Sequence, residues 1–100
     1  MKVIIEEIGG EDKIKEATIN TLKRTIQEAY DSNFATRVRV YHKIFGSYTE
    51  IAYISMIRPL EIHLNGYHIT ERELRVYVRF MLENSKPGRE VFDLTWKENT

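Results

Sequence analysis

The sequence predicts an α+β domain in which two helices pack on one face of a mostly antiparallel sheet, in the element order β-α-β-β-β-β-α-β. Three observations predict this fold class. Apolar residues recur at helical spacing in two segments, the chain between them alternates with a period of two, and glycine-containing turns interrupt that alternation. With 100 residues, of which 42% are apolar, the chain is long enough for one domain over residues 1–100 and too short for two.

The outer elements of this order are two strands and a first helix. Lys2 to Ile8 is rich in Val and Ile and precedes Gly9-Gly10, which predicts a strand and a turn. A helix is expected from about Glu11 to Tyr30, because acidic residues suit its first turn and apolar residues recur on one side. Those apolar residues are Ile19, Leu22, Ile26 and Ala29. After the second helix, a loop over 85–89 and a strand over 91–96 complete the order.

A long hairpin is expected in the middle of the chain. Residues 36–45 and 48–58 alternate, and Gly46-Ser47 between them suits a two-residue type II′ turn. This turn sets Phe45 opposite Tyr48 and gathers basic and aromatic side chains on one face. That face carries Arg37, Arg39, Tyr41, Lys43, Phe45, Tyr48, Glu50, Ala52, Ile54 and Met56, and the other carries Val38, Val40, Ile44, Ile51, Tyr53 and Ile57. A shift by one residue would exchange the two faces.

A second hairpin is expected over residues 60–70. Asn65-Gly66 is a strong signal for a two-residue hairpin turn, and apolar and polar residues alternate on both sides of it. The turn pairs His63 with His68 across the two strands and leaves Glu61 on the same face. Two imidazoles and a carboxylate can bind zinc or iron, and the plainer interpretation is a polar hairpin face without a metal. We therefore expect no cofactor.

The segment 71–84 fits either a strand or a helix. Thr70 and Glu73 form a capping box, which favours the helix. A helix here aligns three arginines along one side, namely Arg72, Arg75 and Arg79. Such a stripe can hold phosphates or an acidic partner. More often such a stripe is a solvated face, which Glu71 and Glu83 would partly neutralise here.

The composition argues against several classes of function. The absence of cysteine excludes disulfides, thiolate metal sites and a cysteine nucleophile. Equal numbers of basic and acidic residues, 15 of each, give the whole chain no electrostatic attraction to nucleic acid or an anionic membrane. No serine lies in a nucleophile-elbow pattern, so we expect neither an enzyme nor a small-molecule substrate. No signal core and no membrane-spanning run is found, so a cytoplasmic location is expected.

The face of the first hairpin is the best functional candidate. Between residues 36 and 58, four basic residues accompany a single acidic residue, although the whole chain is neutral. Aromatic side chains and arginine are enriched in protein interfaces, and the same residue types stack on bases and hold phosphates. The candidate binding residues of this face are Arg37, Arg39, Tyr41, Lys43, Phe45 and Tyr48.

These observations predict a small non-enzymatic binding module that acts through its sheet face. The expected partner is a protein, which includes a second copy of the chain in a homodimer, and the module would serve as a regulator or inhibitor of a larger machine. The alternative is a nucleic-acid-binding protein that uses the basic and aromatic hairpin face together with the arginine stripe of the second helix.

Overall fold

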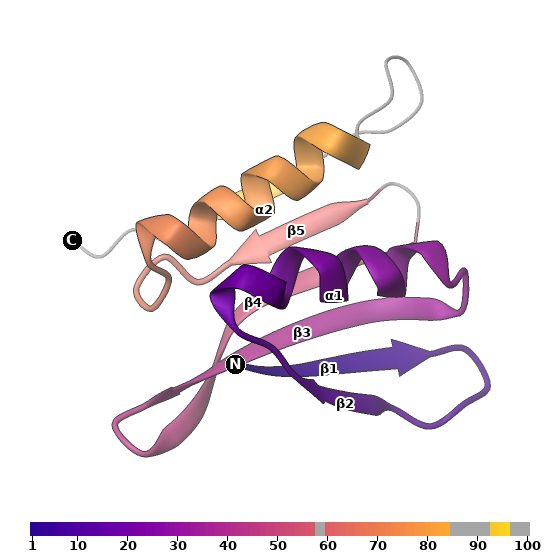
Figure 1. The fold of residues 1–100 in the computed structure, drawn as a ribbon, viewed down its shortest axis with the longest axis horizontal. Coiled ribbons are helices and arrows are strands. Elements are labelled where there is room, and N and C mark those ends of the chain that lie inside the picture. Colours follow the sequence, from indigo (N-terminus) through magenta and orange to yellow (C-terminus); the bar gives the residue numbers. More distant parts are fainter. Residues whose placement is uncertain (58–59, 85–92, 97–100) are drawn as a thin grey trace.

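A computed structural model describes residues 1–57, 60–84 and 93–96 of the chain. These residues form two helices and a single six-stranded sheet (Figure 1). The helices are α1 (Ile19–Asp31) and α2 (Glu71–Asn84). The strands are β1 (Lys2–Glu7), β2 (Lys13–Glu16), β3 (Ala35–Ile44), β4 (Ser47–Ser55), β5 (Glu61–Leu64) and β6 (Asp93–Trp96).

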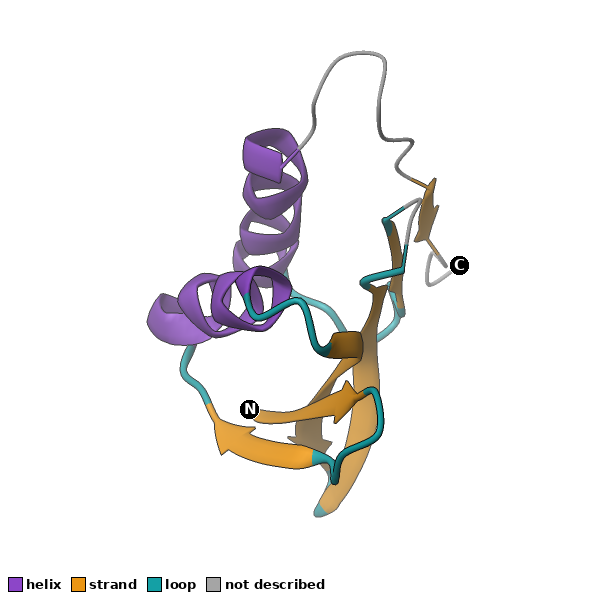
Figure 2. Cartoon of the chain, turned by 90° about the vertical axis from the view of Figure 1, so that its right-hand side faces the viewer, coloured by secondary structure: helices purple, strands orange, loops and turns teal. Residues whose placement is uncertain are grey.

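The strands lie in the order β2-β1-β3-β4-β5-β6. Every neighbouring pair is antiparallel except β5 and β6, which are parallel. Both helices lie on the same side of this sheet (Figure 2). The predicted fold class, an α+β domain with a mostly antiparallel sheet and two helices on one face, is confirmed.

The hydrophobic core fills the layer between the sheet and the two helices. Each long strand contributes alternate aliphatic residues to it, because successive side chains of a strand point to opposite faces. The fully buried side chains include Val3, Val38, Val40, Ile54, Ile62, Leu22, Ile26, Tyr77 and Phe80. Removing each such side chain from water stabilises the fold by about 1.5–3 kcal/mol relative to an exposed position. Neither α1 nor α2 covers the opposite face of the sheet, and we call it the outer face.

The first helix begins later than the sequence predicts. Lys13–Glu16 forms β2 beside β1, with Ile14 opposite Ile4, and α1 begins only at Ile19. Thr18 is the residue before the helix, and its backbone N–H donates to the Thr21 hydroxyl at 2.9 Å. The acidic residues that suggested an earlier helix start lie in the connection between the two strands. The helical prediction over 11–18 is therefore wrong, because pairing with β1 decides the conformation of this charged segment.

The hairpin of β3 and β4 forms with a different turn from the predicted one. Phe45 and Gly46, rather than Gly46-Ser47, make the two-residue turn, with φ angles of 50° and 81°. Positive φ at both positions is the signature of a type I′ turn. Lys43 therefore lies opposite Tyr48, whereas the predicted turn would have set it opposite Glu50, two positions farther along β4. A shift by two positions leaves every side chain near the turn on its predicted face.

A β-bulge then changes the register farther from the turn. Between Val40 and Tyr41 the pairing shifts, and Ile51 is the extra residue on β4. Beyond the bulge, Ala52 and Ile54 enter the core and Tyr53 lies on the outer face. The predicted faces of this part of β4 are therefore exchanged. A bulge adds one residue to one strand, and that single residue reverses the alternation.

The second predicted hairpin is wrong, whereas the second helix is confirmed. Asn65 to His68 forms a turn in which the His68 N–H donates to the Asn65 carbonyl at 3.0 Å, and the chain then enters α2. The capping box is present. The Thr70 N–H donates to the Glu73 carboxylate at 2.9 Å, and the Glu73 N–H donates to the Thr70 hydroxyl at 3.2 Å. Of the elements predicted after α2, the loop over 85–89 lies outside the described residues.

Candidate functional site

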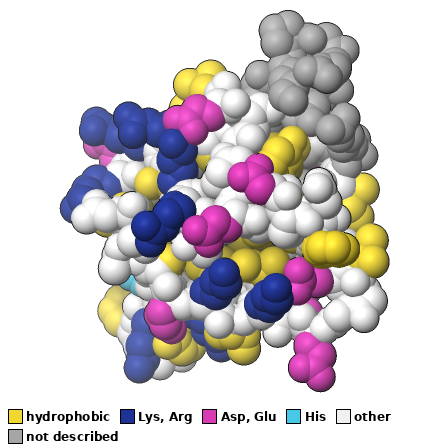
Figure 3. Space-filling view, turned by 45° about the vertical axis from the view of Figure 1, so that its right-hand side comes forward, with side chains coloured by type: hydrophobic (Ala, Val, Ile, Leu, Met, Phe, Trp, Pro, Cys, Tyr) yellow, Lys and Arg dark blue, Asp and Glu magenta, His cyan; other side chains and the backbone are white. Residues whose placement is uncertain are grey.

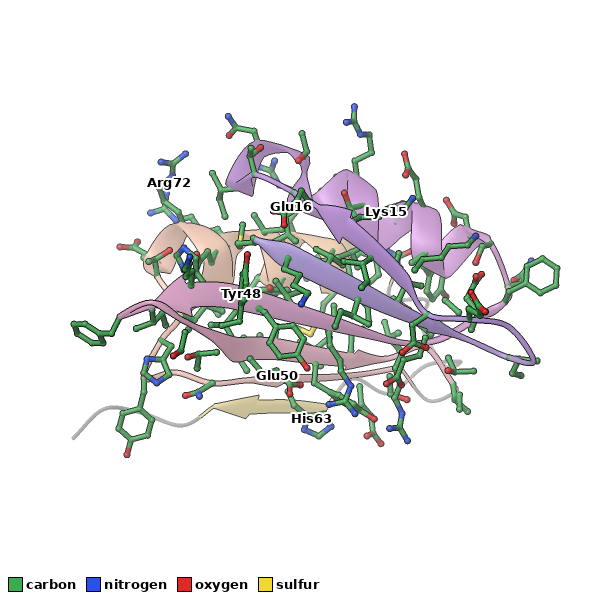
Figure 4. All side chains as sticks on the ribbon, turned by 90° about the horizontal axis from the view of Figure 1, so that it is seen from below. Lys15, Glu16, Tyr48, Glu50, His63 and Arg72 are labelled. Carbon is green, nitrogen blue, oxygen red and sulfur yellow. The ribbon has the colours of Figure 1, made fainter. Side chains whose placement is uncertain are left out.

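The outer face of the sheet brings together most of the predicted binding residues (Figure 4). Strand alternation and the paired registers define its members. They are Lys2, Ile4 and Glu6 of β1, Ile14 and Glu16 of β2, Arg37, Arg39, Tyr41 and Lys43 of β3, Tyr48, Glu50 and Tyr53 of β4, and Glu61 and His63 of β5. The sheet thus joins cations, carboxylates and aromatic rings that lie up to 61 positions apart in the sequence.

Arg39 lies at the centre of this face and contacts three neighbours. Its Nε lies 3.2 Å from a carboxylate oxygen of Glu6, and its Nη1 lies 3.3 Å from one of Glu50. Its guanidinium carbon lies 5.1 Å from the ring centre of Tyr53. Desolvation lowers the pKa of Arg39, but the attraction of Glu50 and Glu6 outweighs it, so the pKa is raised. The guanidinium is therefore held in one orientation by partners on both flanking strands.

The contacts continue from Arg39 to both neighbouring strands. Arg37 lies 3.7 Å from the Glu6 carboxylate and 5.6 Å from the Tyr53 ring centre. On the other side, the rings of Tyr53 and His63 are 5.4 Å apart between centres, and His63 Nε2 lies 3.3 Å from the Glu61 carboxylate. A continuous series of ion pairs and ring contacts thus crosses β1, β3, β4 and β5. These contacts restrain the side chains of Glu6, Arg39 and Tyr53 relative to one another.

The end of the β3–β4 hairpin extends beyond the strands on either side of it. β1 pairs with β3 only as far as Tyr41, and β5 pairs with β4 only as far as Ala52. We call the remaining segment, residues 42–51, the arm, and it projects at the lower left of Figure 1. Phe45 at its tip is fully exposed, and the Lys2 amine lies 5.0 Å from the ring centre of Tyr48 on its outer side.

An open pocket lies at the base of the arm. Its volume is about 390 Å³, and it forms where β5 ends beside β4. The residues that line it are Glu50, Ile51, Ala52, Tyr53, His63, Leu64 and Asn65. The Asn65 N–H donates to the carbonyl of Ile51 at 2.9 Å and so closes one end of this region. The pocket therefore combines aromatic and apolar walls with one carboxylate.

The arginine stripe of α2 lies on a different surface. Arg72, Arg75 and Arg79 are exposed on the helical layer, and Arg75 pairs with Glu71 at 2.7 Å. They line a groove of about 740 Å³ between α1 and α2 together with Lys23. Figure 4 shows Arg72 on the far side of the sheet from Tyr48 and Glu50. The structure thus divides the predicted binding residues between two opposite surfaces.

The predicted pairing of His63 with His68 is wrong. Residues 67–70 form no strand, and His63 lies opposite Tyr53 of β4 instead. Glu61 does approach His63, as its position two residues earlier on the same face requires. Among the residues that the structure describes, no group of three or more His, Asp or Glu side chains has the arrangement of a metal site.

A buried polar cluster that was not predicted from the sequence lies between β3 and α2. The Glu73 carboxylate is buried and lies 3.6 Å from Nδ1 of His42. The hydroxyl of Tyr77, one helical turn later, is buried and makes no hydrogen bond to the described residues. Burial raises the pKa of Tyr77, and the negative charge of Glu73 raises it further. The capping box pointed to Glu73, but no local pattern connected it with His42.

Charges of both signs are mixed over the helical side of the molecule. In Figure 3 the basic side chains gather toward the left of the view, with acidic side chains beside them. No helix among the described residues is long and apolar enough to cross a membrane. The cytoplasmic location and the single domain over 1–100 stay predictions.

Comparison of the chain with protein-family models, with curated proteins and with solved structures finds no significant match.

Proposed function

We propose that this chain is a non-enzymatic binding module that contacts another protein through the outer face of its sheet. The observation that carries the proposal is the pairing of the arginines with carboxylates among aromatic rings. Arg39 binds Glu6 and Glu50, and Arg37 shares Glu6. Protein interfaces are enriched in tyrosine and arginine and require charges of both signs to match a partner.

The charge balance of the outer face supports a protein over a nucleic acid. Among the side chains that the structure describes on β1 to β5, acidic residues are as numerous as basic ones, with Lys2, Arg37, Arg39 and Lys43 against Glu6, Glu16, Glu50 and Glu61. Binding to a phosphate backbone gains most of its free energy from cations that replace counterions. A phosphate would have to compete with carboxylates that already hold these guanidinium groups, and it would meet further carboxylates beside them.

The fixed geometry of the face favours specific binding. A side chain that is free in solution loses rotamer entropy when a partner immobilises it. Arg39 and Tyr53 are already held by contacts within the sheet. A module with one such face and 100 residues can act by covering a surface of a larger assembly, which is the regulator or inhibitor role expected above.

Photo-crosslinking from the outer face tests this proposal. A benzophenone amino acid replaces Tyr48 on the outer face or, as the matched control, Leu82 on the exposed side of α2. In an extract of the cells that make the protein, we expect discrete adducts from position 48 only. An excess of the chain without benzophenone should reduce the yield of these adducts by competing for the partner. The same excess of a chain that carries Arg39→Glu should leave the yield unchanged. Equal adducts from both positions, or none from position 48, would contradict the proposal.

A further inference from the structure

Two complementary features lie at opposite ends of the arm. At the tip, Phe45 exposes its whole side chain to solvent. At the base, the 390 Å³ pocket opens between β4 and β5, with Tyr53 and His63 among its walls. The length of one hairpin arm thus separates the exposed ring of Phe45 from a pocket with aromatic walls.

Phe45 is an unusual residue for its place in the turn. The first position of a type I′ turn requires a positive φ, which asparagine, aspartate and glycine adopt with the least strain. Phe45 adopts a φ of 50° there and gains no burial in return. Phe45 therefore gains no stability from burial to offset the strain of its backbone. Such outliers point to a role in contacts with another molecule.

The charges at the two ends of the arm are also complementary. Lys43 lies two residues before the tip and is exposed on the outer side. Glu50 lines the pocket at the base, and Glu61 lies beside His63 on the same face. A tip that carries an aromatic ring and a cation therefore matches a base that carries an aromatic pocket and carboxylates.

This complementarity fits a second copy of the chain. When two identical arms lie antiparallel on each other, a two-fold axis at their middle places each tip on the other chain's base. The distance from Phe45 to the pocket is spanned by about seven residues of extended strand, roughly 23 Å, in both chains alike. Both contacts form together, because the two-fold axis repeats each of them.

We infer that two copies of this chain form a two-fold symmetric dimer in which Phe45 of each copy fills the other copy's base pocket and Lys43 lies against Glu50. The inference rests on the proposed function, because Glu50, Tyr53 and His63 of the pocket lining belong to the outer face. It adds the identity of the partner and the residue that anchors it. Anchors of this kind, buried aromatic side chains ringed by polar contacts, supply most of the free energy of many interfaces.

Sedimentation of the full chain over a wide concentration range tests this dimer. We expect a monomer–dimer equilibrium for the natural chain and at least about tenfold weaker association for Phe45→Asn. Asparagine suits the left-handed turn position, so this variant keeps the hairpin, and circular dichroism with thermal melting checks that it does. Phe34→Asn is the matched control, because Phe34 is also largely exposed but lies in the loop between α1 and β3.

Crosslinking between labelled chains locates the contact. A benzophenone amino acid replaces Phe45 in a mixture of isotopically light and heavy chains, and mass spectrometry identifies adducts between them. We expect mixed adducts at residues 50–53 or 63–65 of the second chain. A chain that stays monomeric, a dimer that survives Phe45→Asn, or adducts elsewhere would each overturn the inference.

The two proposals fail in different ways. The chain could be monomeric while position 48 forms adducts with a different protein that excess chain prevents. In that case the dimer is wrong and the proposed binding module is supported. If the monomer binds vesicles of anionic phospholipid or an oligonucleotide through Phe45, the dimer is wrong as well. If neither position 45 nor position 48 forms specific adducts, both proposals are wrong.

Discussion

The carboxylate of Glu73 lies 3.6 Å from Nδ1 of His42 and joins the start of α2 to the base of the arm. Its side chain is only 6% exposed, whereas that of His42 is 43% exposed. The other carboxylate oxygen of Glu73 accepts the hydrogen bond from the Thr70 N–H. One buried side chain therefore both begins the helix and contacts a strand that lies 31 positions earlier in the sequence.

Replacing Glu73 should weaken the fold more than replacing an exposed glutamate of the same helical turn. Glu73→Ala removes one half of the capping box, and we expect the free energy of unfolding to fall by about 1–2 kcal/mol. Glu71→Ala removes only the exposed pair with Arg75 and should change it by less than about 0.5 kcal/mol. Urea denaturation measures both variants. Equal losses would show that the buried position of Glu73 adds nothing.

The hydroxyl of Tyr77 should not be needed for stability. It is buried, and none of the described residues accepts or donates a hydrogen bond to it. A buried polar atom without a partner keeps its desolvation penalty, so Tyr77→Phe should leave the free energy of unfolding unchanged or raise it by up to about 1 kcal/mol. Thermal and urea denaturation provide the measurement. A clear loss of stability in this variant would contradict the expectation.

Tyr77 should also make the protein sensitive to alkali. Burial and then the charge of Glu73 raise its pKa above the ordinary tyrosine value. The unfolded chain loses this proton near pH 10, whereas the folded chain retains it. The free energy of unfolding is therefore unaffected by Tyr77 below that pH and falls above it. The expected slope is about 1.4 kcal/mol per pH unit for this one group. Urea denaturation between pH 9 and pH 11 (about one unit on either side of the ordinary value) should show a smaller fall for Tyr77→Phe.

Two isoleucines of the same region test the β-bulge. Ile54 is fully buried beyond the bulge, whereas Ile57 is mostly exposed, which is the reverse of the faces predicted from the sequence. Ile54→Ala should lower the free energy of unfolding by about 2–5 kcal/mol. Ile57→Ala should lower it by less than about 0.5 kcal/mol. The opposite ranking in urea denaturation would support the register without the bulge.

The outer face should bind nucleic acid weakly. Fluorescence anisotropy with single- and double-stranded oligonucleotides, at about 50 and 200 mM salt, measures the affinity and its salt dependence. We expect no tight complex at the lower salt concentration, because Arg37 and Arg39 are paired with carboxylates. Tight binding that weakens steeply with salt, and that Arg37→Glu with Arg39→Glu abolishes, would favour the nucleic-acid alternative.

Some local signals in the sequence predicted local structure correctly, whereas the turn signals Gly46-Ser47 and Asn65-Gly66 did not. The capping box of Thr70 and Glu73 identifies the start of α2, because both partners lie within one helical turn. The fold class follows from periodicity in the same way. The α2 arginines were also predicted to share one side, and all three are exposed and line the same groove.

Features that depend on distant partners were not predictable from local patterns. The charged segment 13–16 resembles a helix start and becomes a strand, because β1 offers it a pairing edge. The bulge at Ile51 leaves no mark in the sequence, yet it moves Tyr53 to the outer face. The ion pairs of Arg39 join residues up to 33 positions apart, so the charge balance of the face emerges only when the strands align.

The exposed edge strand β2 protects the sheet against pairing with other chains. β2 covers the aliphatic strand β1, and three of its four residues are charged. A short charged strand is a poor template for the addition of further strands. Without β2, the aliphatic segment Val3-Ile4-Ile5 would lie in the edge strand of the sheet, where it could pair with strands of other chains. A chain that lacks 13–16 should therefore form fibrous aggregates.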